Sequence, residues 1–386
     1  MGITAGLSTR WMIGGVLLLG CLASASTARA ATPEQTRASI RKAVEFLYAQ
    51  QNAQGNWEQN QQRTTNKHAD INGAQWGGGS AQALLALLAA GESPQDPRIQ
   101  KAAQWVGQAD IIGVYALSMR MQVYPYLRPT QQVRDWARRD AELMYKALKD
   151  EGDAKGMYSY WLDPATDKSR FDHSCSQIAV LGMWAAAQMN LEIARTYWAT
   201  VDQAWRQHQN ADGSWDYSLH KTESSKQPAM TAAGIATLFI TQDFLNRGMG
   251  GECAGNRRDE NIDKGLAWMS HNFERIKSGR SFYTLYGIER IGVASGRKYF
   301  GTTDWFQEGA EHLVKSQNPD GSWDEAEFTG TGFPCVFYLK YHLYRNYFPL
   351  YALARLRNLK KGITEFRAVE VSPDSFERRN GARRSA

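Results

Sequence analysis

Two kinds of helical segment alternate along the chain. The first kind mixes charged residues with apolar ones three and four positions apart, which is typical of helices with one buried face. The second kind is apolar nearly all round, as in helices buried on both sides. The first lies at 35–51, 97–108, 131–149, 192–209, 259–273 and 303–317, and the second at 78–90, 113–123, 174–189, 229–245, 282–295 and 334–354. The alternation predicts six helical hairpins, each with an outer and an inner helix.

A seven-residue pattern, Gln-x-x-x-Gly-x-Trp, recurs between the two kinds of segment. Weaker Gly-x-aromatic echoes occur at Gly113-Val-Tyr115 and Gly156-Met-Tyr158, and a looser one runs from Gly279 to Tyr283. The full pattern stands at Gln51, Gly55 and Trp57, at Gln209, Gly213 and Trp215, and at Gln317, Gly321 and Trp323. Units of roughly 40 to 70 residues indicate a repeat array. We therefore predict an all-α fold over residues 31–356, a closed α/α barrel (toroid) of about six hairpins whose inner helices surround a central cavity.

The two ends of the chain depart from this pattern. Residues 1–30 carry Arg10 ahead of an apolar run and end in Ala28-Arg29-Ala30, which predicts a signal peptide cleaved after Ala30 and a periplasmic or secreted protein. A lipoprotein signal with Cys21 as the lipidated residue is the alternative. Residues 357–386 hold eight Lys and Arg against four Asp and Glu. We expect this segment to be a disordered basic tail, with contact to anionic lipid headgroups as the alternative.

Charge and cysteine content exclude some classes of protein. The net charge of +6 arises from the two ends of the chain, so the body is near neutral and nothing indicates a nucleic-acid partner. Only Cys175, Cys253 and Cys335 follow residue 30. They allow one disulfide bond but not a disulfide-stapled framework.

Aromatic residues cluster near the carboxy-terminal end of the predicted barrel. Phe333, Phe337, Tyr341 and Tyr344 are four, four and three residues apart, which places the rings on one face of a helix. Such a face is either plain core or a surface that stabilises a cation in a dry pocket through the ring quadrupoles.

The carboxy-terminal segment and the repeat resemble motifs of a known family. The run TGTGFP followed by FYLKYHLYRNYFPLYALAR resembles the carboxy-terminal end of squalene-hopene cyclases, and the repeat resembles the QW motif of terpene cyclases, shared in looser form with protein prenyltransferase subunits. The resemblance implies a toroid whose repeat tryptophans are structural clamps. It also implies that the four aromatic residues line the cavity where carbocations form. Cys335 and Val336 stand where the family usually has Gly-Asp, the D-x-D-D acid motif is absent, and the length fits one barrel instead of two.

Polar residues just before inner helices are the candidates for chemistry, because these loops open onto one mouth of the barrel. Asp172 precedes the third inner helix and is either its N-terminal cap or a general acid with a pKa raised by burial. His173 is the candidate proton relay. Asp70 and Trp76, ahead of the first inner helix, are candidate substrate contacts, with solvation as the alternative for Asp70.

The leading hypothesis is a squalene or terpene cyclase-like protein that binds a polyisoprenoid or other long apolar ligand and, if active, catalyses proton-initiated cyclisation as an isomerase. One alternative is a non-catalytic lipid-binding or protein-interaction scaffold. Another is a carbohydrate-active α/α barrel, with Asp70 and Asp172 as a pair of carboxylates. We expect no cofactor. We also expect no metal, because the Asp-x-Cys pair of a prenyltransferase zinc site is absent. The sequence leaves the ligand's identity and the oligomeric state open.

Overall fold

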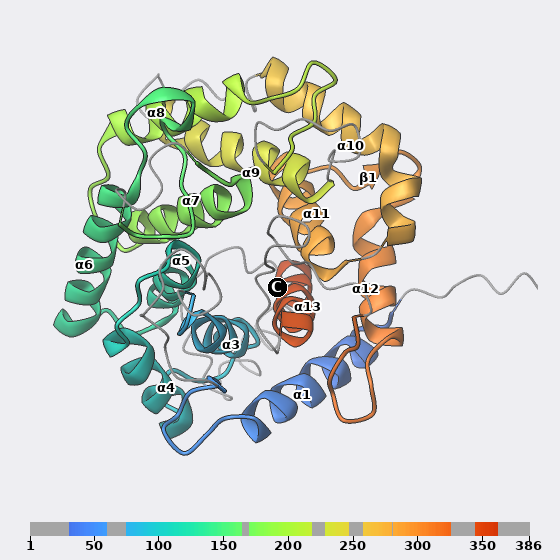
Figure 1. The fold of residues 1–386 in the computed structure, drawn as a ribbon. Helices are drawn as coiled ribbons and strands as arrows, with labels where there is room; N and C mark the ends of the chain where they lie inside the picture. Colours follow the sequence, from blue (N-terminus) through green and yellow to red (C-terminus); the bar gives the residue numbers. More distant parts are fainter. Residues whose placement is uncertain are drawn as a thin grey trace, which may run out of the picture.

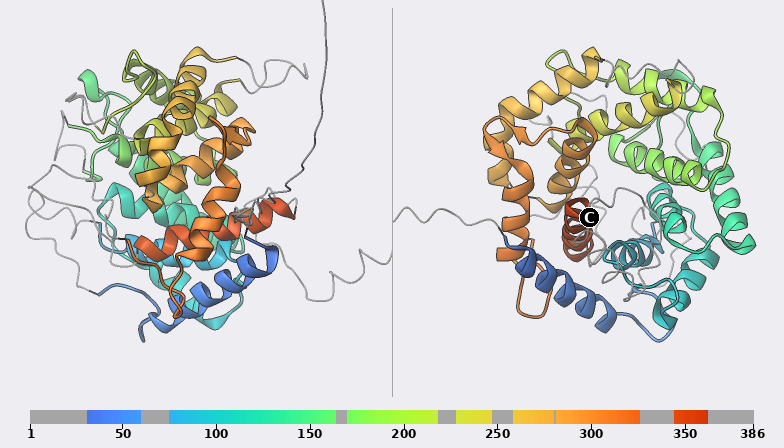
Figure 2. Two further views of the ribbon diagram at one scale, coloured as in Figure 1. Left: turned by 90° about the vertical axis from the view of Figure 1, so that its right-hand side faces the viewer. Right: turned by 180° about the vertical axis from the view of Figure 1, so that it is seen from behind.

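The helices of the computed structural model form two concentric rings (Figure 1). The structure describes residues 31–59, 75–163, 170–217, 228–246, 258–279, 281–325 and 344–361. The outer helices are α1 (Pro33–Ala49), α4 (Pro97–Gln108), α6 (Gln131–Ala147), α8 (Arg195–Gln207), α10 (Glu260–Gly279) and α12 (Trp305–Lys315). The inner helices are α3 (Gly78–Ala89), α5 (Val114–Val123), α7 (His173–Gln188), α9 (Pro228–Leu245), α11 (Phe282–Ser295) and α13 (Tyr344–Lys360). The predicted all-α toroid fold is confirmed, and the view from behind shows the same two rings (Figure 2).

Short elements complete the described chain. Two 3-10 helices, η1 (Tyr124–Tyr126) and η2 (Gly152–Ala154), follow α5 and α6. Strands β1 (Tyr299–Phe300) and β2 (Thr303–Asp304) pair antiparallel ahead of α12. These elements occupy connections and do not change the ring arrangement.

The side-chain pattern explains why each helix joins its ring. In α1 the buried positions include Thr36, Ile40, Ala43 and Leu47, which are three or four residues apart and form one stripe. All residues of α3, in contrast, are buried. A helix with one apolar stripe, such as α1, fits the outer ring because its polar face can contact water. Helix α3 fits the inner ring because it has packed neighbours on every side.

The inner ring closes on itself. Contacts run from α3 through α5, α7, α9 and α11 to α13, and α13 also contacts α3. The outer ring closes at α1, which contacts α12. Because the first and last hairpins meet, the ends of the repeat array are covered by each other.

The Gln-x-x-x-Gly-x-Trp segments make the same contacts at all three sites. Each Gln side-chain amide donates to the carbonyl of the Gly four residues later and to a carbonyl of the next outer helix. The acceptors in the next helix are Arg98 of α4 for Gln51 (3.1 Å), Asn261 of α10 for Gln209 (2.9 Å) and Ser39 of α1 for Gln317 (2.9 Å). The indole nitrogens of Trp57, Trp215 and Trp323 each donate to the carbonyl of the residue ten positions earlier. Each segment is therefore a clamp between neighbouring outer helices.

The glycine of each clamp has a left-handed backbone. Its φ is +89° at Gly55, +93° at Gly213 and +92° at Gly321. A Cβ atom at Gly213 would lie 2.6 Å from the backbone oxygen of Lys264, so the next outer helix packs directly on the glycine. Gly156 behaves in the same way against Thr200 of α8. The Gly113 echo differs, because it is the N-cap of α5 and lies in extended backbone.

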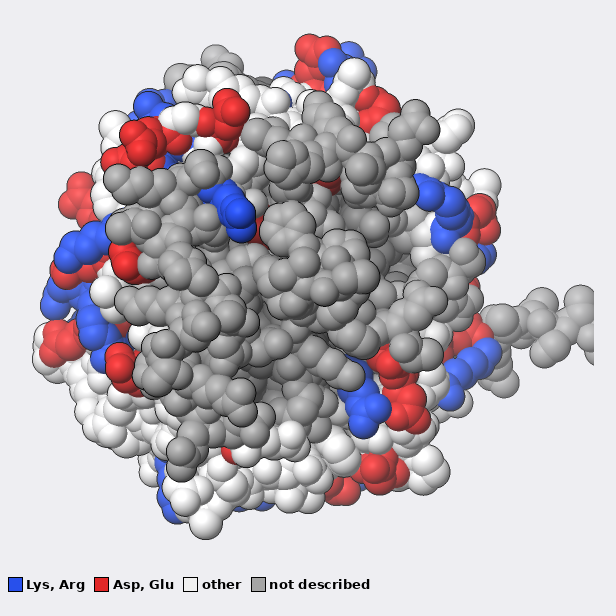
Figure 3. Space-filling view, viewed as in Figure 1, with Lys and Arg blue, Asp and Glu red and all other residues white. Residues whose placement is uncertain are grey.

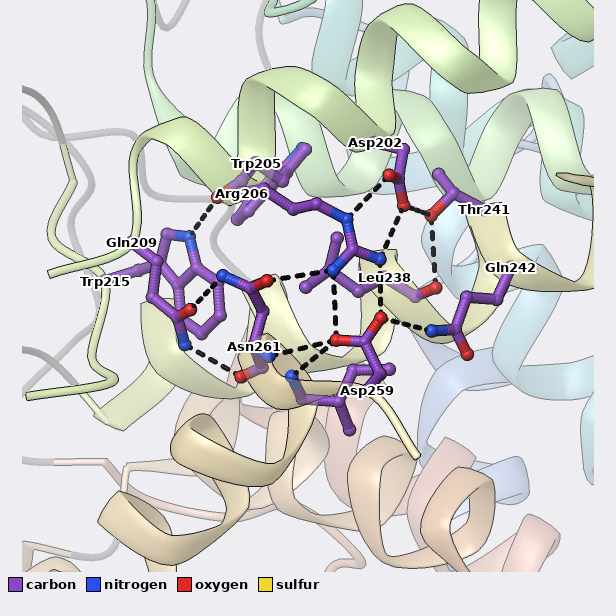
Figure 4. Close-up of polar contacts among 11 residues, drawn as sticks. Asp202, Trp205, Arg206, Gln209, Trp215, Leu238, Thr241, Gln242, Asp259 and Asn261 are labelled. Carbon is purple, nitrogen blue, oxygen red and sulfur yellow. Dashed lines mark hydrogen bonds and ion pairs between the residues drawn. The ribbon is translucent and has the colours of Figure 1, made fainter. Parts of the chain in front are cut away.

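Arg206 of α8 is the centre of a polar network that joins three helices (Figure 4). Its guanidinium lies 2.7 Å from Asp202 in the same helix and 2.7 Å from Asp259 ahead of α10. The hydroxyl of Thr241 in α9 donates to Asp202 (2.7 Å), and the amide of Gln242 donates to Asp259 (2.6 Å). Both carboxylates are paired with the same guanidinium, so the network fixes α9 against its outer neighbours.

A buried ion pair has the same role at α5. Arg120 of α5 lies 2.7 Å from Asp140 of α6, with both side chains almost fully buried. The hydroxyl of Tyr124 also donates to Asp140 (2.6 Å), and Arg120 donates to the carbonyl of Ala109 after α4 (2.6 Å). Because each charge is partnered, the cost of burying it is offset and α4, α5 and α6 are held in register.

The carboxy-terminal boundary differs from the predicted one. Helix α13 continues to Lys360, past the predicted limit at residue 356. Arg357 and Asn358 donate to the carbonyl of Ala89 at the end of α3 (3.5 and 3.4 Å), which extends the helix. Residues 334–343 of the predicted inner helix, the predicted signal peptide and the rest of the predicted tail lie outside the described residues.

The described surface carries charges of both signs. On the face shown in Figure 3, Lys and Arg side chains alternate with Asp and Glu side chains around the periphery. None of the helices in the described ranges is both long and apolar enough to cross a membrane.

Candidate functional site

The segments that precede inner helices meet at one mouth of the barrel. The side-chain amide of Gln75, ahead of α3, donates to the carbonyl of Tyr160 (2.7 Å), ahead of α7. Its oxygen accepts from the backbone nitrogen of Ala116 in the first turn of α5 (3.1 Å). This one side chain therefore ties three consecutive entry segments together. Trp76, a predicted substrate contact, packs its ring on Trp105 of α4, with ring centroids 5.1 Å apart.

Asp172 is the N-cap of α7 and lies at this mouth. Its Oδ1 accepts from the backbone nitrogens of Ser174 (2.7 Å) and Cys175 (3.2 Å), and also from the Ser174 hydroxyl. Its Oδ2 accepts from the hydroxyl of Tyr160 at 3.3 Å. The capping role expected as one alternative is therefore present. It occupies Oδ1 and leaves Oδ2 with one long hydrogen bond.

Burial raises the pKa of Asp172, although the hydrogen bonds from Ser174, Cys175 and Tyr160 partly oppose this. Every other carboxyl in the described ranges with a clearly shifted pKa has it lowered. Asp172 thus retains a proton at a higher pH than an ordinary aspartate. A carboxyl of this kind has the chemistry of a general acid, provided that a substrate can bind within reach of its proton.

Three tyrosines lie near the Asp172 carboxyl, and Tyr115 lies near one of them, Tyr283. Burial, and then the charge of Asp172, raises the pKa of Tyr217, which precedes the loop to α9. Burial also raises the pKa of Tyr283 in the first turn of α11, with further contributions from Tyr115, Tyr217 and Asp172. We call Tyr115, Tyr160, Tyr217 and Tyr283 the tyrosine cluster. The Tyr160 hydroxyl contacts the Asp172 carboxyl, and Tyr217 and Tyr283 are near enough to interact with it electrostatically.

His173 turns away from Asp172. Its buried ring packs against Phe171, Trp205 and His208, with centroid separations of 5.2, 4.8 and 5.3 Å. Neither ring nitrogen has a hydrogen-bond partner within the described part of the chain. Burial, and then the nearby His208, lowers the pKa of His173 to about 3. Among the described residues, no hydrogen bond joins this ring to the Asp172 carboxyl, so the predicted relay has no direct path between the two side chains.

The other predicted substrate contacts cannot be placed at this mouth. Asp70, Phe333, Phe337 and Tyr341 lie outside the described residues. Tyr344 is the first residue of α13, and its side chain is also outside them. Their roles stay predictions.

A second feature lies toward the other ends of the inner helices. A cavity of about 300 Å³ is lined mainly by residues from the C-terminal halves of α7, α9 and α11, with α3, α5, η1 and α13 completing the wall. Arg290 of α11 lines it and donates to Gln177 of α7 (2.6 Å), whose amide in turn donates to the hydroxyl of Tyr283. A chain of hydrogen bonds therefore links this cavity to the tyrosine cluster.

Sequence reasoning missed the tyrosine cluster and this chain of hydrogen bonds. Tyr283 lies in the first turn of α11, so the positional rule that selected Asp172 also points to it. Tyr160 and Tyr217 lie 13 and 11 residues before α7 and α9, in the segments that lead into these helices. Gln177 and Arg290 interrupt apolar runs of inner helices, and that interruption was the available signal. Across the described ranges, no three His, Cys, Asp or Glu side chains are arranged to hold a metal ion.

Comparison with known proteins places the carboxy-terminal part of the chain. Residues 293–358 match the family model of the squalene-hopene cyclase C-terminal domain. The chain is 56% identical over 63 residues to the squalene-hopene cyclase of Bradyrhizobium diazoefficiens, a segment covering 16% of this chain and 9% of that one. It is 40% identical over 84 residues to the enzyme of Zymomonas mobilis, covering 22% and 12%. The carboxy-terminal region is homologous to squalene-hopene cyclases. The matched segments span about a tenth of the length of these curated relatives.

Solved structures with the same fold belong to two functional classes. The type II terpene cyclase MstE from Scytonema, in complex with geranylgeranyl dihydroxybenzoate, matches with a TM-score of 0.51 and 12% identity over 84% of this chain and 98% of that one. The unsaturated glucuronyl hydrolase from Bacillus sp. GL1 matches with a TM-score of 0.52 and 12% identity over 87% and 99%. These likenesses establish the α/α toroid fold, which terpene cyclases share with a sugar hydrolase.

Proposed function

We propose that this terpene cyclase-like protein binds a polyisoprenoid or similar long apolar ligand in its barrel and isomerises it by proton-initiated cyclisation. The observation that carries the proposal is the buried Asp172 carboxyl, with its raised pKa, within the tyrosine cluster of a toroid. Homology of the carboxy-terminal region to squalene-hopene cyclases supports it. So does the size of MstE, because a single toroid of this extent is a type II terpene cyclase.

In this proposal the protonated Asp172 is the acid. Oδ1 is held by the backbone and hydroxyl donors of α7, so the proton resides on Oδ2, the oxygen that Tyr160 contacts. Transfer of that proton to an alkene carbon leaves a carboxylate and a carbocation. The faces of the tyrosine cluster stabilise the positive charge, and so do Phe333, Phe337, Tyr341 and Tyr344 if they line the same cavity. Loss of a proton from the cation completes an isomerisation without any cofactor.

The proposal is tested by incubating the purified protein with squalene in detergent, re-isolating it, and quantifying retained squalene and cyclised products of equal mass. Asp172→Asn is the decisive variant, because Asn caps a helix as well as Asp does but cannot supply the proton. We expect product formation to fall by about 100-fold or more, in the range of general acid catalysis, while squalene retention is unchanged.

Asp96→Asn is the matched control. Asp96 caps outer helix α4 through the backbone nitrogen of Arg98 (2.8 Å), and it belongs to none of the segments that meet at the mouth. It should keep full turnover. Full activity in Asp172→Asn would eliminate Asp172 as the acid, and retained squalene without any product in the unmodified protein would favour a lipid-binding scaffold.

A second candidate function is cleavage of a carbohydrate. The observation in its favour is the fold, which matches the unsaturated glucuronyl hydrolase about as well as it matches the terpene cyclase. Release of reducing ends from a polysaccharide panel, abolished by Asp172→Asn, would support it over the cyclase.

A further inference from the structure

The cavity near the C-terminal ends of the inner helices is the size of a small organic ligand. Its volume of about 300 Å³ equals that of roughly ten water molecules. Much of the wall is apolar, with Leu181, Trp184, Phe239 and Ile240 among the lining side chains. A pocket of this volume with an apolar wall and a few polar groups is typical of a small-molecule site.

The cavity extends away from the Asp172 mouth along α7. Asp172 caps the start of α7, whereas Trp184 lies twelve residues farther along the helix. At 1.5 Å per residue, the two are about 18 Å apart along the helix axis. The Trp184 end of the cavity therefore lies well away from the Asp172 carboxyl, whereas Arg290 reaches Gln177, five residues after Asp172.

Arg290 lines this cavity and has a side-chain nitrogen without a hydrogen-bond partner among the described residues. Its Nη1 donates to the side-chain oxygen of Gln177 at 2.6 Å, and its guanidinium lies 5.5 Å from the centroid of the Tyr286 ring. Its Nη2 is buried and has no hydrogen-bond partner among the residues that the structure describes. Within the same ranges, no carboxylate forms an ion pair with Arg290. A buried donor on a cation without an acceptor is destabilising, and an anion placed there removes that cost.

The neighbouring charges do not supply that anion. Arg355 of α13 is paired with Glu289 (2.7 Å) and also donates to the hydroxyl of Tyr351. Asp243 of α9 lines the same cavity, but it is engaged in interactions of its own. Of the two arginines in the described wall of the cavity, Arg290 is the one without an ion pair to a carboxylate.

We infer that this cavity binds a small carboxylate with an apolar body, a molecule of the medium-chain fatty acid class. Its carboxylate accepts from Nη2 of Arg290, and its hydrocarbon packs on Trp184, Phe239 and the aliphatic residues of α7 and α9. This ligand needs neither the acid nor the tyrosine cluster, so its binding can be measured apart from the reaction proposed for Asp172.

Titration calorimetry of the full-length protein with octanoate tests the inference, with 1-octanol and octylamine as neutral and cationic probes of the same length. We expect octanoate to bind at least about tenfold more tightly than either. Arg290→Gln keeps a donor for Gln177 but removes the charge, and it should weaken octanoate about tenfold or more while leaving 1-octanol unchanged. Arg41→Gln, an exposed position on α1, is the matched control and should bind as the unmodified protein does.

A cavity-filling variant keeps the test decisive if Arg290→Gln folds poorly. Ala294→Phe fills part of the cavity and keeps the charge of Arg290, and it should abolish binding of octanoate and 1-octanol together. Thermal unfolding shows which variants are folded. The inference is overturned if octanoate does not bind the unmodified protein, if octanoate and 1-octanol bind equally, or if folded Ala294→Phe binds octanoate normally.

Discussion

At the scale of single residues, burial drives two adjacent side chains at the start of α7 toward their neutral forms. It raises the pKa of Asp172 and lowers that of His173 to about 3. The first effect produces a candidate acid. The second removes a charge from an aromatic environment formed by Phe171, Trp205 and His208, which makes His173 a packing residue of the α7 and α8 interface.

The histidine should make stability depend on pH. Unfolded His173 binds a proton below pH 6.5, whereas in the folded protein it stays neutral to about pH 3. The free energy of unfolding therefore holds its full value above pH 6.5 and decreases as the pH falls toward 3, by roughly 2 kcal/mol between pH 8 and pH 5. His173→Phe should remove that decrease, as urea unfolding at the two pH values would show.

His271→Gln is the control for this measurement. His271 is exposed on α10, so the substitution should leave the difference between pH 8 and pH 5 unchanged. Equal pH dependence in His173→Phe and the unmodified protein would contradict the assignment of His173 as a buried neutral ring.

The sequence identified Asp172 but could not show how its neighbours are oriented. The direction of the His173 ring depends on Trp205 and His208, more than thirty residues later, and no local pattern encodes that contact. The tyrosine cluster is likewise assembled from several entry segments. The sequence shows which residues precede an inner helix. It does not show which of their side chains come together, because that depends on how the helices pack in the ring.

At the scale of elements, the alternation of half-exposed and buried segments was enough to predict the hairpins. The six outer segments and the described parts of the six inner segments correspond to helices of the structure, because burial on one side or on all sides follows directly from the spacing of apolar residues. The end of α13 was placed too early. Arg357 and Asn358 look like the start of a solvated basic tail, and only the fold reveals the Ala89 carbonyl that they contact.

The clamps provide the prediction at this scale. Gly321 has a φ of +92°, and a Cβ atom there would overlap the backbone carbonyl of Lys42 in α1. Gly296 also has a positive φ, +65°, but a Cβ atom added there would meet no described atom within 4 Å. Gly296→Ala should lower the free energy of unfolding by about 1 kcal/mol from backbone strain alone. Gly321→Ala should lower it by about 2 kcal/mol more, because the backbone of α1 must move.

Urea unfolding of the two variants at one pH measures this difference. Gly296 is the matched comparison, since the two positions share the left-handed backbone and differ in the packed neighbour. An equal loss of unfolding free energy in the two variants would show that α1 does not pack tightly on the clamp. The hydrogen bond from Gln317 to the Ser39 carbonyl would then contribute little to stability.

At the scale of the whole molecule, closure distinguishes this toroid from an open repeat array. In an open array each repeat contacts only its neighbours, and the terminal repeats need polar caps. Here α13 contacts α3, and the last clamp bonds to α1, so the terminal hairpins cover each other. The ring also places Asp172 at the start of α7 and the Trp184 end of the Arg290 cavity twelve residues later in the same helix.

Closure predicts a single cooperative unfolding transition. Removing α1 from the ring breaks its contacts with both α12 and α13, and it also exposes the clamp at Gln317, so no hairpin can leave without opening the whole ring. Tryptophan fluorescence and far-ultraviolet circular dichroism should therefore report the same urea midpoint. Gln317→Ala, which cuts the bond to α1, should lower both midpoints together, as should Gln209→Ala in the clamp between α8 and α10. Separate transitions, or a midpoint that moves for one probe only, would show that the hairpins unfold one at a time. The contact between the first and last repeats would then not make unfolding of the ring cooperative.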